Sequence, residues 1–344
     1  MINASLKLSV SEQSHVGEAR RRAASLAAEA NFNETEAGKV AIVVTEMATN
    51  IIKHAQRGEI IFSHININGL HMLEFLAIDK GPGIADIMSS LEDGHSTAGS
   101  AGTGLGAIAR QSSDFDIFSQ ADAGTVVMSR FFDRNTASAM AKENVSVGCV
   151  CVPVDGEIRC GDGWAVLQNG QHLKVLVVDG IGHGVLASEA SQLAIASFHE
   201  SQQLSPVQYV HAAHAALRAT RGAALAVIDI DMVKSTSVFA GAGNIAASII
   251  HGPSSRGLAS YNGIVGHQLH KVNELNYPFP ADALLVMASD GLNTRWNLAA
   301  YPALKMRHPS VIAGVLYRDF QRGRDDVTVL VAMLRSDGNR HKWI

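Results

Sequence analysis

The sequence has few cysteines, few prolines and no long uninterrupted apolar run. Its three cysteines, Cys149, Cys151 and Cys160, cannot form an even set of disulfides and lack the Cys-x-x-Cys spacing of a metal site, so we expect reduced thiols. The longest apolar runs, such as 283–288, fall far short of the roughly 20 residues that span a bilayer. The N-terminus lacks the basic and then apolar layout of a secretory signal. We therefore expect a soluble, cytoplasmic protein with no membrane partner.

Charge of one sign is also lacking. The chain has 28 basic and 32 acidic residues, which give a formal net charge of −4, and neither sign forms a long run. This distribution excludes the basic surface that nucleic-acid binding needs. Of the 344 residues, 47% are hydrophobic and 17% are charged, so the chain can bury enough apolar surface to fold. At about 150 residues per domain, the length predicts roughly two domains.

A polar segment of small residues, 133–144, separates two regions whose residues alternate as in strands, and we place the domain boundary there. We expect a first domain over 1–135 and a second over 143–344. The first should be an α+β layer of helices on a sheet, and the second should contain sheets sandwiched by helices. Expected helices are 19–30, 34–54, 106–111, 183–200, 206–221 and 310–321, and expected strands lie near Leu6 and at 59–66, 71–78, 114–119, 125–132, 145–153, 163–179, 223–230, 236–240, 246–250, 283–288 and 327–334.

The second helix carries the first candidate site. Asn33 and Glu36 form an Asn-x-x-Glu capping pattern at its start. Further along, Glu46 and Asn50 are four residues apart, so both side chains project from one face of the helix. A carboxylate and an amide oxygen in this arrangement suit a hydrated Mg²⁺, although an ordinary solvated helix face would look the same.

Two glycine-containing segments follow. Asp79 ends a strand and could accept a hydrogen bond from an exocyclic amine, while Gly81 and Gly83 allow backbone to pass close to a flat ring, although Asp-x-Gly also makes ordinary turns. The run 101–107 (AGTGLGA) enters a helix, where free backbone amides can bind phosphate. That run also fits a dinucleotide fingerprint, but it follows a loop rather than a strand, which disfavours a Rossmann domain.

The segments TEMATNIIKHA, DKGPGI and GTGLGAIAR, in this order, resemble the GHKL (Bergerat) ATP-binding fold, and most of all its RsbW and RsbT type of switch serine kinase. The resemblance covers about residues 5–132. It implies that Glu46 is the base for the attacking serine, that Asn50 binds the Mg²⁺ of ATP and that Asp79 recognises adenine. It also implies a nucleotide pocket lined by Gly81 and Gly83, with the phosphates held by Gly102, Gly104 and Gly106.

One departure concerns the expected lid of this site. Between Lys80 and Arg110 the sequence contains no lysine or arginine, so the lid cannot neutralise charge on a phosphoryl group in transfer. Lys53, His54, Arg110 or a partner residue would have to do so. Otherwise the domain binds ATP without efficient kinase chemistry.

Acidic residues mark the ends of four strands in the second half: Asp162, Asp179, Asp290 and the pair Asp325 and Asp326. Any one of them could be a simple turn residue. Together, carboxylates from four chain segments would repel one another unless cations lay between them, and hard divalent ions prefer such all-oxygen sites. Two ions can activate a water molecule and clamp a phosphate ester for in-line attack.

The segments CGDGWA, VVDGIGHGVLAS, FAGAGN, MASDGL and GRDDVTVLV resemble the PP2C-like, SpoIIE-type serine phosphatases such as RsbU and RsbX, over about residues 143–335. The resemblance implies an α/β/β/α sandwich and Mn²⁺ or Mg²⁺, with two ions expected. It implies the metal ligands Asp162, Asp179, Asp290 and the carbonyl of Gly180, with Asp325 as the better fourth ligand and Asp326 as the second choice.

Two features near these ligands stay open. His183, just before the long helix, could shuttle a proton or bind metal, but a histidine that hydrogen-bonds backbone at the helix start is the favoured interpretation. The family's second acid near the first aspartate is replaced by Gly163 and Trp164, which puts the weaker metal sites in doubt.

The combined resemblance implies a partner-switching enzyme, in which an ATP-binding kinase-like domain precedes a metal-dependent phosphoserine and phosphothreonine phosphatase. The implied partner is a STAS-type antagonist protein in a circuit that controls a sigma factor or comparable regulator; a homodimer is compatible with the sequence. Two alternatives remain: an ATP-gated binding module that transfers no phosphate, and a hydrolase of small phosphate esters.

Overall fold

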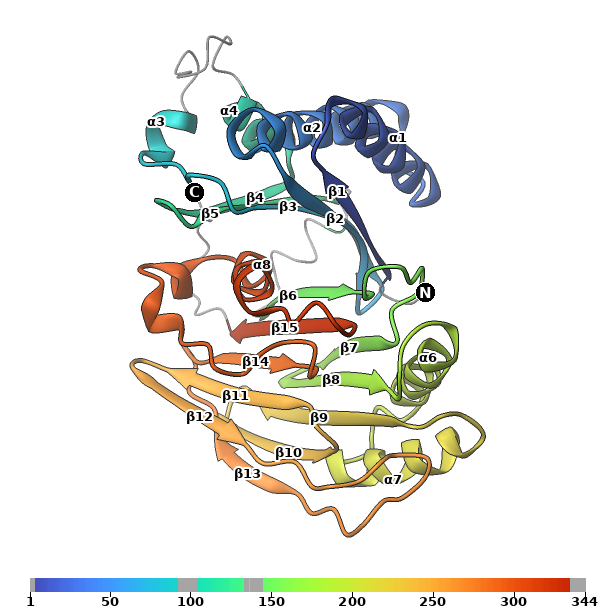
Figure 1. Cartoon of the computed structure of the whole chain (residues 1–344). Coiled ribbons are helices and arrows are strands. Elements are labelled where there is room, and N and C mark those ends of the chain that lie inside the picture. The colour runs from blue at the N-terminus through green and yellow to red at the C-terminus, as the bar shows by residue number, and fades with distance from the viewer. Residues whose placement is uncertain (1–3, 92–103, 133–135, 137–144, 335–344) are drawn as a thin grey trace. The chain divides into compact units, whose positions relative to one another are not determined.

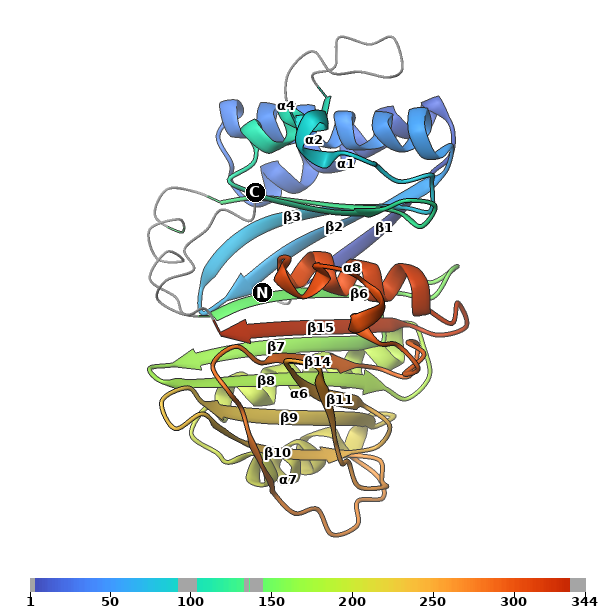
Figure 2. The same cartoon turned by 90° about the vertical axis from the view of Figure 1, so that its left-hand side faces the viewer.

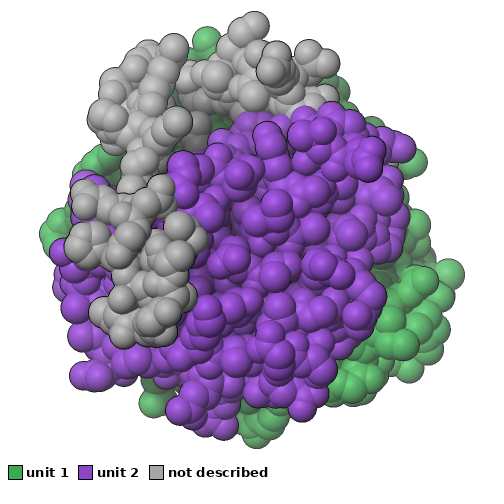
Figure 3. Space-filling model, turned by 90° about the horizontal axis from the view of Figure 1, so that it is seen from above, with its two compact units in different colours: residues 1–3, 144–300, 319–339 green, residues 4–143, 301–318, 340–344 purple. Residues whose placement is uncertain are grey.

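The computed structural model describes residues 4–91, 104–132, 136 and 145–334 (Figure 1). The chain forms two compact units, which Figure 3 shows in different colours. The N-terminal unit comprises residues 4–143 together with 301–318, and the C-terminal unit comprises residues 144–300 together with 319–339. Residues 301–318, which the sequence places beyond the polar segment, therefore pack with the first half of the chain.

The N-terminal unit is an antiparallel sheet of five strands in the order β1-β2-β3-β5-β4, with α1 and α2 on one face (Figure 1). Its elements are β1 (Ala4–Val10), α1 (Gln13–Glu29), α2 (Glu34–Asn50), β2 (Gly58–Ile67), β3 (Leu70–Asp79), α3 (Ile87–Leu91), α4 (Gly104–Gln111), β4 (Asp114–Gln120) and β5 (Gly124–Phe131). This is the helix-on-sheet layer that the sequence predicts.

Helix α2 is fixed at its start by a cap and along its length by an apolar face. The side chain of Asn33 accepts a hydrogen bond of 2.9 Å from the backbone of Glu36, as the capping pattern predicts. Val40, Val43 and Val44 are completely buried beneath the helix. After Asn50 the chain continues through a π-helical turn, Ile51–Ala55, so the helical region ends close to the position expected from the sequence.

The second face of the N-terminal sheet carries an unusual buried ion pair. Glu74 on β3 accepts a hydrogen bond of 2.5 Å from Arg130 on β5, and both side chains are inaccessible to solvent. Ser310, at the start of α8 (Pro309–Phe320), donates to the same Glu74 oxygen at 2.6 Å. The pair thus fastens the segment 301–318 to the sheet.

We expect Arg130→Met to destabilise the N-terminal unit strongly, because it leaves the Glu74 carboxylate buried without its cation. The expected loss is about 3–5 kcal/mol in the free energy of unfolding. Urea unfolding of the full-length protein measures it. The matched control, Arg20→Met on the exposed side of α1, should change stability by less than about 0.5 kcal/mol. Equal stability of the two variants would show that the ion pair is dispensable.

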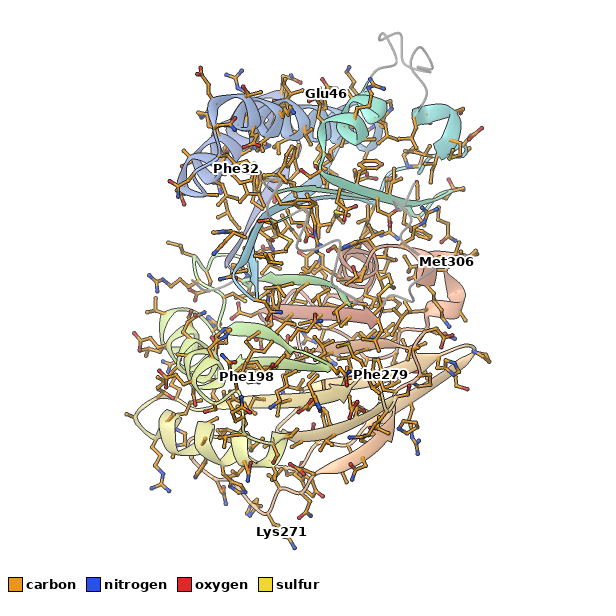
Figure 4. The ribbon with its side chains drawn as sticks, turned by 180° about the vertical axis from the view of Figure 1, so that it is seen from behind. Phe32, Glu46, Phe198, Lys271, Phe279 and Met306 are labelled. Atoms are coloured by element: carbon orange, nitrogen blue, oxygen red, sulfur yellow. The ribbon has the colours of Figure 1, made fainter. Side chains whose placement is uncertain are left out.

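The C-terminal unit contains two five-stranded sheets, in the orders β13-β10-β9-β8-β7 and β12-β11-β14-β15-β6, stacked face to face (Figure 2). Its strands are β6 (Val145–Val152), β7 (Asp162–Asn169), β8 (His172–Gly180), β9 (Ala223–Asp231), β10 (Thr236–Ala242), β11 (Ala246–His251), β12 (Ser254–Leu258), β13 (Leu275–Pro278), β14 (Leu284–Ala288) and β15 (Val327–Leu334). Helices α6 (Val185–Glu200) and α7 (Pro206–Ala216) pack on the first sheet. Phe198 of α6, labelled in Figure 4, lies in the core between them, and so does Tyr209 of α7.

None of the helices in the described part of the chain is long and apolar enough to cross a membrane.

Candidate functional site

The structure brings together two of the three segments expected at a nucleotide site. Glu46 lies on α2 beside α4 (Figure 4). Gly104, the first residue of α4, is so close to this helix that a β-carbon there would lie 3.3 Å from Glu46 Oε2 and 3.3 Å from Asn50 Oδ1. The start of the glycine-run helix therefore faces the two oxygen-bearing side chains. Any larger residue at 104 would displace one of them.

Asp79, the third element of this site, sits at the end of β3 with its carboxylate held in place. Its Oδ1 accepts hydrogen bonds from the backbone of Gly81 at 2.8 Å and of Thr125 at 3.3 Å. Burial raises the pKa of Asp79, whereas these hydrogen bonds and the charges of Arg318 and His54 lower it. Both backbone bonds use one oxygen, and they fix the direction in which the other points.

The neighbouring glycines are required by close packing. A β-carbon on Gly81 would lie 2.7 Å from the side chain of Ala55. Gly83 has a φ of +75°, and a β-carbon there would lie 2.3 Å from the carbonyl oxygen of Gln120. Gly106 is buried within α4. Gly102, the other expected phosphate-binding residue, lies outside the described residues.

In the C-terminal unit, all four acidic segments meet at the ends of their strands. Asp162 on β7 is the direct antiparallel partner of Asp179 on β8. The hydroxyl of Ser289 donates a hydrogen bond of 2.7 Å to Asp162 Oδ2, and the backbone of Thr328 donates to that hydroxyl at 2.9 Å. The acidic residues at the ends of β7, β8, β14 and β15 thus lie in one region of the unit.

Asp290 and Gly180 are also fixed by their neighbours. The amide of Asn244 donates a hydrogen bond of 2.7 Å to Asp290 Oδ2. At Gly180, a β-carbon would lie 2.1 Å from the carbonyl oxygen of Ala187 in α6, so only glycine fits. This packing sets the position of the Gly180 peptide, whose carbonyl is one of the expected ligands.

The structure distinguishes the two members of the final acidic pair. Asp326 is buried, and its two oxygens accept hydrogen bonds from the backbone of Val154 at 2.7 Å and of Gly161 at 2.6 Å. Asp325 Oδ1 accepts a single bond of 2.9 Å from the backbone of Asp326. Asp326 therefore fixes the loop between β6 and β7, whereas Asp325 is the member of the pair with fewer hydrogen bonds to its carboxylate.

This difference predicts separate effects for the two residues. Asp326→Asn should lower the thermal stability of the protein, because an amide cannot accept both backbone hydrogen bonds. Asp325→Asn should leave the melting temperature within a few degrees of the unaltered protein and reduce divalent-metal-dependent activity. Differential scanning fluorimetry and a phosphatase assay on both variants test this. The opposite pattern would make Asp326 the ligand.

The proximity of these carboxylates is visible in their electrostatics. Burial, followed by the charges of Asp162, Asp290, Asp325 and Asp326, raises the pKa of Asp179 to about 9. Burial also raises the pKa of Asp162 to about 7, although the hydrogen bond from Ser289 opposes that shift. Cations bound between carboxylates that lie this close together would stabilise their ionised forms.

The donor set fits hard divalent ions, because it consists of carboxylate and carbonyl oxygens. The spacing is looser than that of a complete metal centre: within the part of the chain that the structure describes, no three His, Cys, Asp or Glu side chains are grouped closely enough to hold one ion. These residues suit divalent ions because they offer oxygen ligands and lie in the same region of the unit. They do not form a complete coordination shell.

Comparison with known proteins assigns each half of the chain to a class. Residues 10–131 match the histidine kinase-like ATPase domain, and residues 169–335 match the domain of stage II sporulation protein E (SpoIIE). The serine/threonine-protein kinase RsbT of Bacillus subtilis (strain 168) is 34% identical over 109 residues, which are 32% of this chain and 82% of RsbT. Through its N-terminal half, the chain belongs to the RsbT family. It joins this kinase-like ATPase domain to a SpoIIE, PP2C-like phosphatase domain.

The chain is also similar to solved structures. A protein of the bacterial stressosome, described as a modular system adapted to control secondary messenger signalling, is 30% identical with a TM-score of 0.52; the match covers 55% of this chain and 100% of that one. The phosphatase domain of SpoIIE from Bacillus subtilis, with a fragment of its regulatory domain, is 18% identical with a TM-score of 0.47, over 78% of this chain and 80% of that one.

Four residues of this RsbT-like and SpoIIE-like chain were not singled out from the sequence. Thr125 holds Asp79, Ser289 holds Asp162, Asn244 holds Asp290, and Glu157 bonds to His183 Nδ1 at 2.7 Å. The structure thus gives His183 a side-chain partner instead of the backbone bond that the sequence favours. Asn244 could have been found, because it ends the FAGAGN segment. Nothing in the sequence marks Thr125 or Glu157 as functional, because the residues that they contact are distant in sequence.

Proposed function

We propose that this chain is a bifunctional partner-switching regulator, in which a metal-dependent phosphoserine and phosphothreonine phosphatase is combined with an ATP-binding, serine-kinase-like domain. The observation that carries the proposal is the convergence of Asp162, Asp179, Asp290 and Asp325 at the ends of four strands, where Asp162 is buried and the other three are partly exposed. We assign the phosphatase activity to residues 143–344 and the nucleotide site to residues 1–135. Residues 301–318 pack with the unit that contains the nucleotide site.

In the phosphatase site, Asp162, Asp179, Asp290, Asp325 and the Gly180 carbonyl would hold Mn²⁺ or Mg²⁺. When bound, such ions lower the pKa of a water molecule and clamp the phosphate ester for in-line attack. The surrounding residues orient these oxygen atoms. Ser289 and Asn244 do so by donating hydrogen bonds to Asp162 and Asp290.

The adjacent His183 and Glu157 have the geometry of a proton-transfer pair. Glu157 Oε1 accepts a hydrogen bond from His183 Nδ1 at 2.7 Å, which leaves Nε2 of the exposed ring for a substrate oxygen. Within the proposal, His183 delivers a proton to the departing seryl oxygen. Glu157 holds the ring.

In the N-terminal unit, ATP would bind with Mg²⁺. Asp79 would accept a hydrogen bond from the adenine amine, between backbone supplied by Gly81 and Gly83. Asn50 would contribute an oxygen to the Mg²⁺, and the amides around Gly102, Gly104 and Gly106 would hold the phosphates. Glu46, which lies beside Gly104, would accept the proton of an attacking serine hydroxyl.

The proposed substrate is a STAS-type antagonist protein, phosphorylated on serine or threonine, which regulates a sigma factor or a comparable output. Its support is the 34% identity with the kinase RsbT and the likeness to a stressosome protein. A kinase and a phosphatase in one chain would set the phosphorylation level of that antagonist by opposing reactions.

Two assays test the proposal. The purified protein in Mn²⁺ should release phosphate from a phosphorylated STAS protein at a higher kcat/KM than from p-nitrophenyl phosphate. With [γ-³²P]ATP, the Asp290→Asn protein should label the unphosphorylated STAS protein. Equal activity on both phosphate esters would favour a hydrolase of small phosphate esters.

A second candidate function is an ATP-gated binding module that transfers no phosphate, fused to the same phosphatase. The observation in its favour is the absence of lysine and arginine from residues 81–109. This candidate predicts that the Asp290→Asn protein binds the STAS protein in an ATP-dependent manner and never labels it.

A further inference from the structure

The segment 301–318 lies in the part of the sequence that matches SpoIIE, but it belongs to the N-terminal unit (Figure 3). It begins with an aromatic contact, in which the rings of Tyr301 and Phe118 on β4 are 6.4 Å apart. The backbone of His308 then donates a hydrogen bond of 2.6 Å to the buried Asp116, and Arg307 donates to the same carboxylate at 3.1 Å. These contacts hold the segment against the sheet face opposite α1 and α2.

Helix α8 continues the contact along β3 and β5. Ser310 bonds to Glu74 at 2.6 Å and to Arg130 at 2.9 Å, and all three side chains are buried. One turn further along, a β-carbon on Gly314 would lie 2.8 Å from Val126 and 3.7 Å from Ile78. The helix therefore runs directly behind the strand ends that carry Asp79 and Thr125.

Arg318 is the next residue on that face of the helix, since it lies four positions after Gly314. Its side chain is 1% exposed. Ile78 and Val126, which Gly314 contacts, immediately adjoin Asp79 and Thr125, which are joined by the 3.3 Å hydrogen bond. The guanidinium is thus a permanent positive charge buried behind the residue proposed to bind adenine.

We infer that Arg318 is a positioning residue of the nucleotide site, whose buried positive charge keeps the carboxylate of Asp79 ionised and able to accept the adenine amine. The inference deepens the proposed function and rests on it. It assigns to the SpoIIE-matching part of the chain a role in nucleotide binding.

The charges around Asp79 support this role. Burial disfavours the ionised form of Asp79 and raises its pKa. Backbone donors at Gly81 and Thr125 oppose the effect, as do two cationic side chains, Arg318 from α8 and His54 from the π-helical turn after α2. An arginine side chain stays charged throughout the range from pH 5.5 to 8.

The test is ATP binding as a function of pH in the full-length protein. In Arg318→Met, the pKa of Asp79 rises further, so affinity should be lost at a higher pH than in the unaltered protein. We expect binding about fivefold weaker at pH 6 and less than about twofold weaker at pH 8. Arg318→Lys should restore most of the original profile. Arg322→Met, an exposed arginine beyond α8, should leave it unchanged.

Calorimetry with Mg²⁺-ATP between pH 5.5 and 8 decides the matter, with inosine triphosphate as a probe that lacks the amine. An Arg318→Met protein with the original pH profile, or with a uniform loss at every pH, would overturn the inference. Should that variant not fold, Arg318→Gln supplies the same decision: it should also shift the loss of ATP affinity to a higher pH, and an unaltered pH profile would overturn the inference. Failure of the unaltered protein to bind ATP would reject the nucleotide site itself.

Discussion

Asp179→Asn and Asp290→Asn should each reduce Mn²⁺-dependent phosphatase turnover by on the order of 100-fold or more, while ATP binding by the N-terminal unit persists. Each carboxylate is proposed to hold the ion that activates water, and an amide oxygen binds a divalent ion more weakly. The effect should be confined to the C-terminal unit, because each unit has its own hydrophobic core. Phosphate release from a phosphorylated STAS protein, alongside calorimetry with ATP, measures both quantities.

The matched control is Asp282→Asn. Asp282 also lies in the C-terminal unit, but its side chain is 78% exposed and it pairs with His251 instead of other acids. This variant should retain full turnover. Retention of turnover by the Asp179→Asn protein as well would reject the metal assignment, whereas simultaneous loss of ATP binding would indicate global unfolding.

The elements on which these sites rest could be predicted from local sequence. The Asn33 cap and the buried valines of α2 identify a helix that places Glu46 and Asn50 on one face, and the structure confirms that helix. The strands missed by sequence reasoning are the short ones. β12 is almost entirely exposed and β13 has four residues, so neither has the buried alternation that marks a strand.

The acidic residues could also be identified from local sequence, because each carboxylate follows or precedes an apolar strand. The residues that hydrogen-bond to them could not be identified in this way. Ser289 and Asp162 meet only after β7 and β14 have taken their places in two different sheets. Likewise, Thr125 reaches Asp79 because β5 pairs with β3. Such contacts depend on strand order, which periodicity does not encode.

The packing of residues 301–318 had no sequence signal at all. Glu74 and Arg130 stand in alternating strands at positions that resemble solvent-facing residues, yet both are buried against Ser310. A charged residue on an antiparallel strand normally faces water. Here the second face of the sheet is covered by a segment from the far end of the chain, and only the tertiary structure reveals it.

Asn50→Ala and Glu46→Gln should separate nucleotide binding from phosphotransfer in the N-terminal unit. Removal of the Asn50 amide takes an oxygen from the Mg²⁺ of ATP, so affinity should fall about tenfold, or about 1.4 kcal/mol. Glu46→Gln keeps the shape of the side chain and removes the base. Labelling of the STAS protein should then fall by on the order of 100-fold while ATP affinity changes little.

The control for both is Glu34→Gln, an exposed acid at the start of the same helix, which should alter neither quantity. All three substitutions are made in the Asp290→Asn background, so that dephosphorylation does not erase the label. Equal loss of ATP affinity in the Glu46→Gln and Asn50→Ala proteins would make Glu46 a metal ligand or a structural residue, because a base acts only where the hydroxyl proton moves. Since Gly104 lies against both side chains at the same distance, a difference between the two variants would arise from their chemistry rather than from their position.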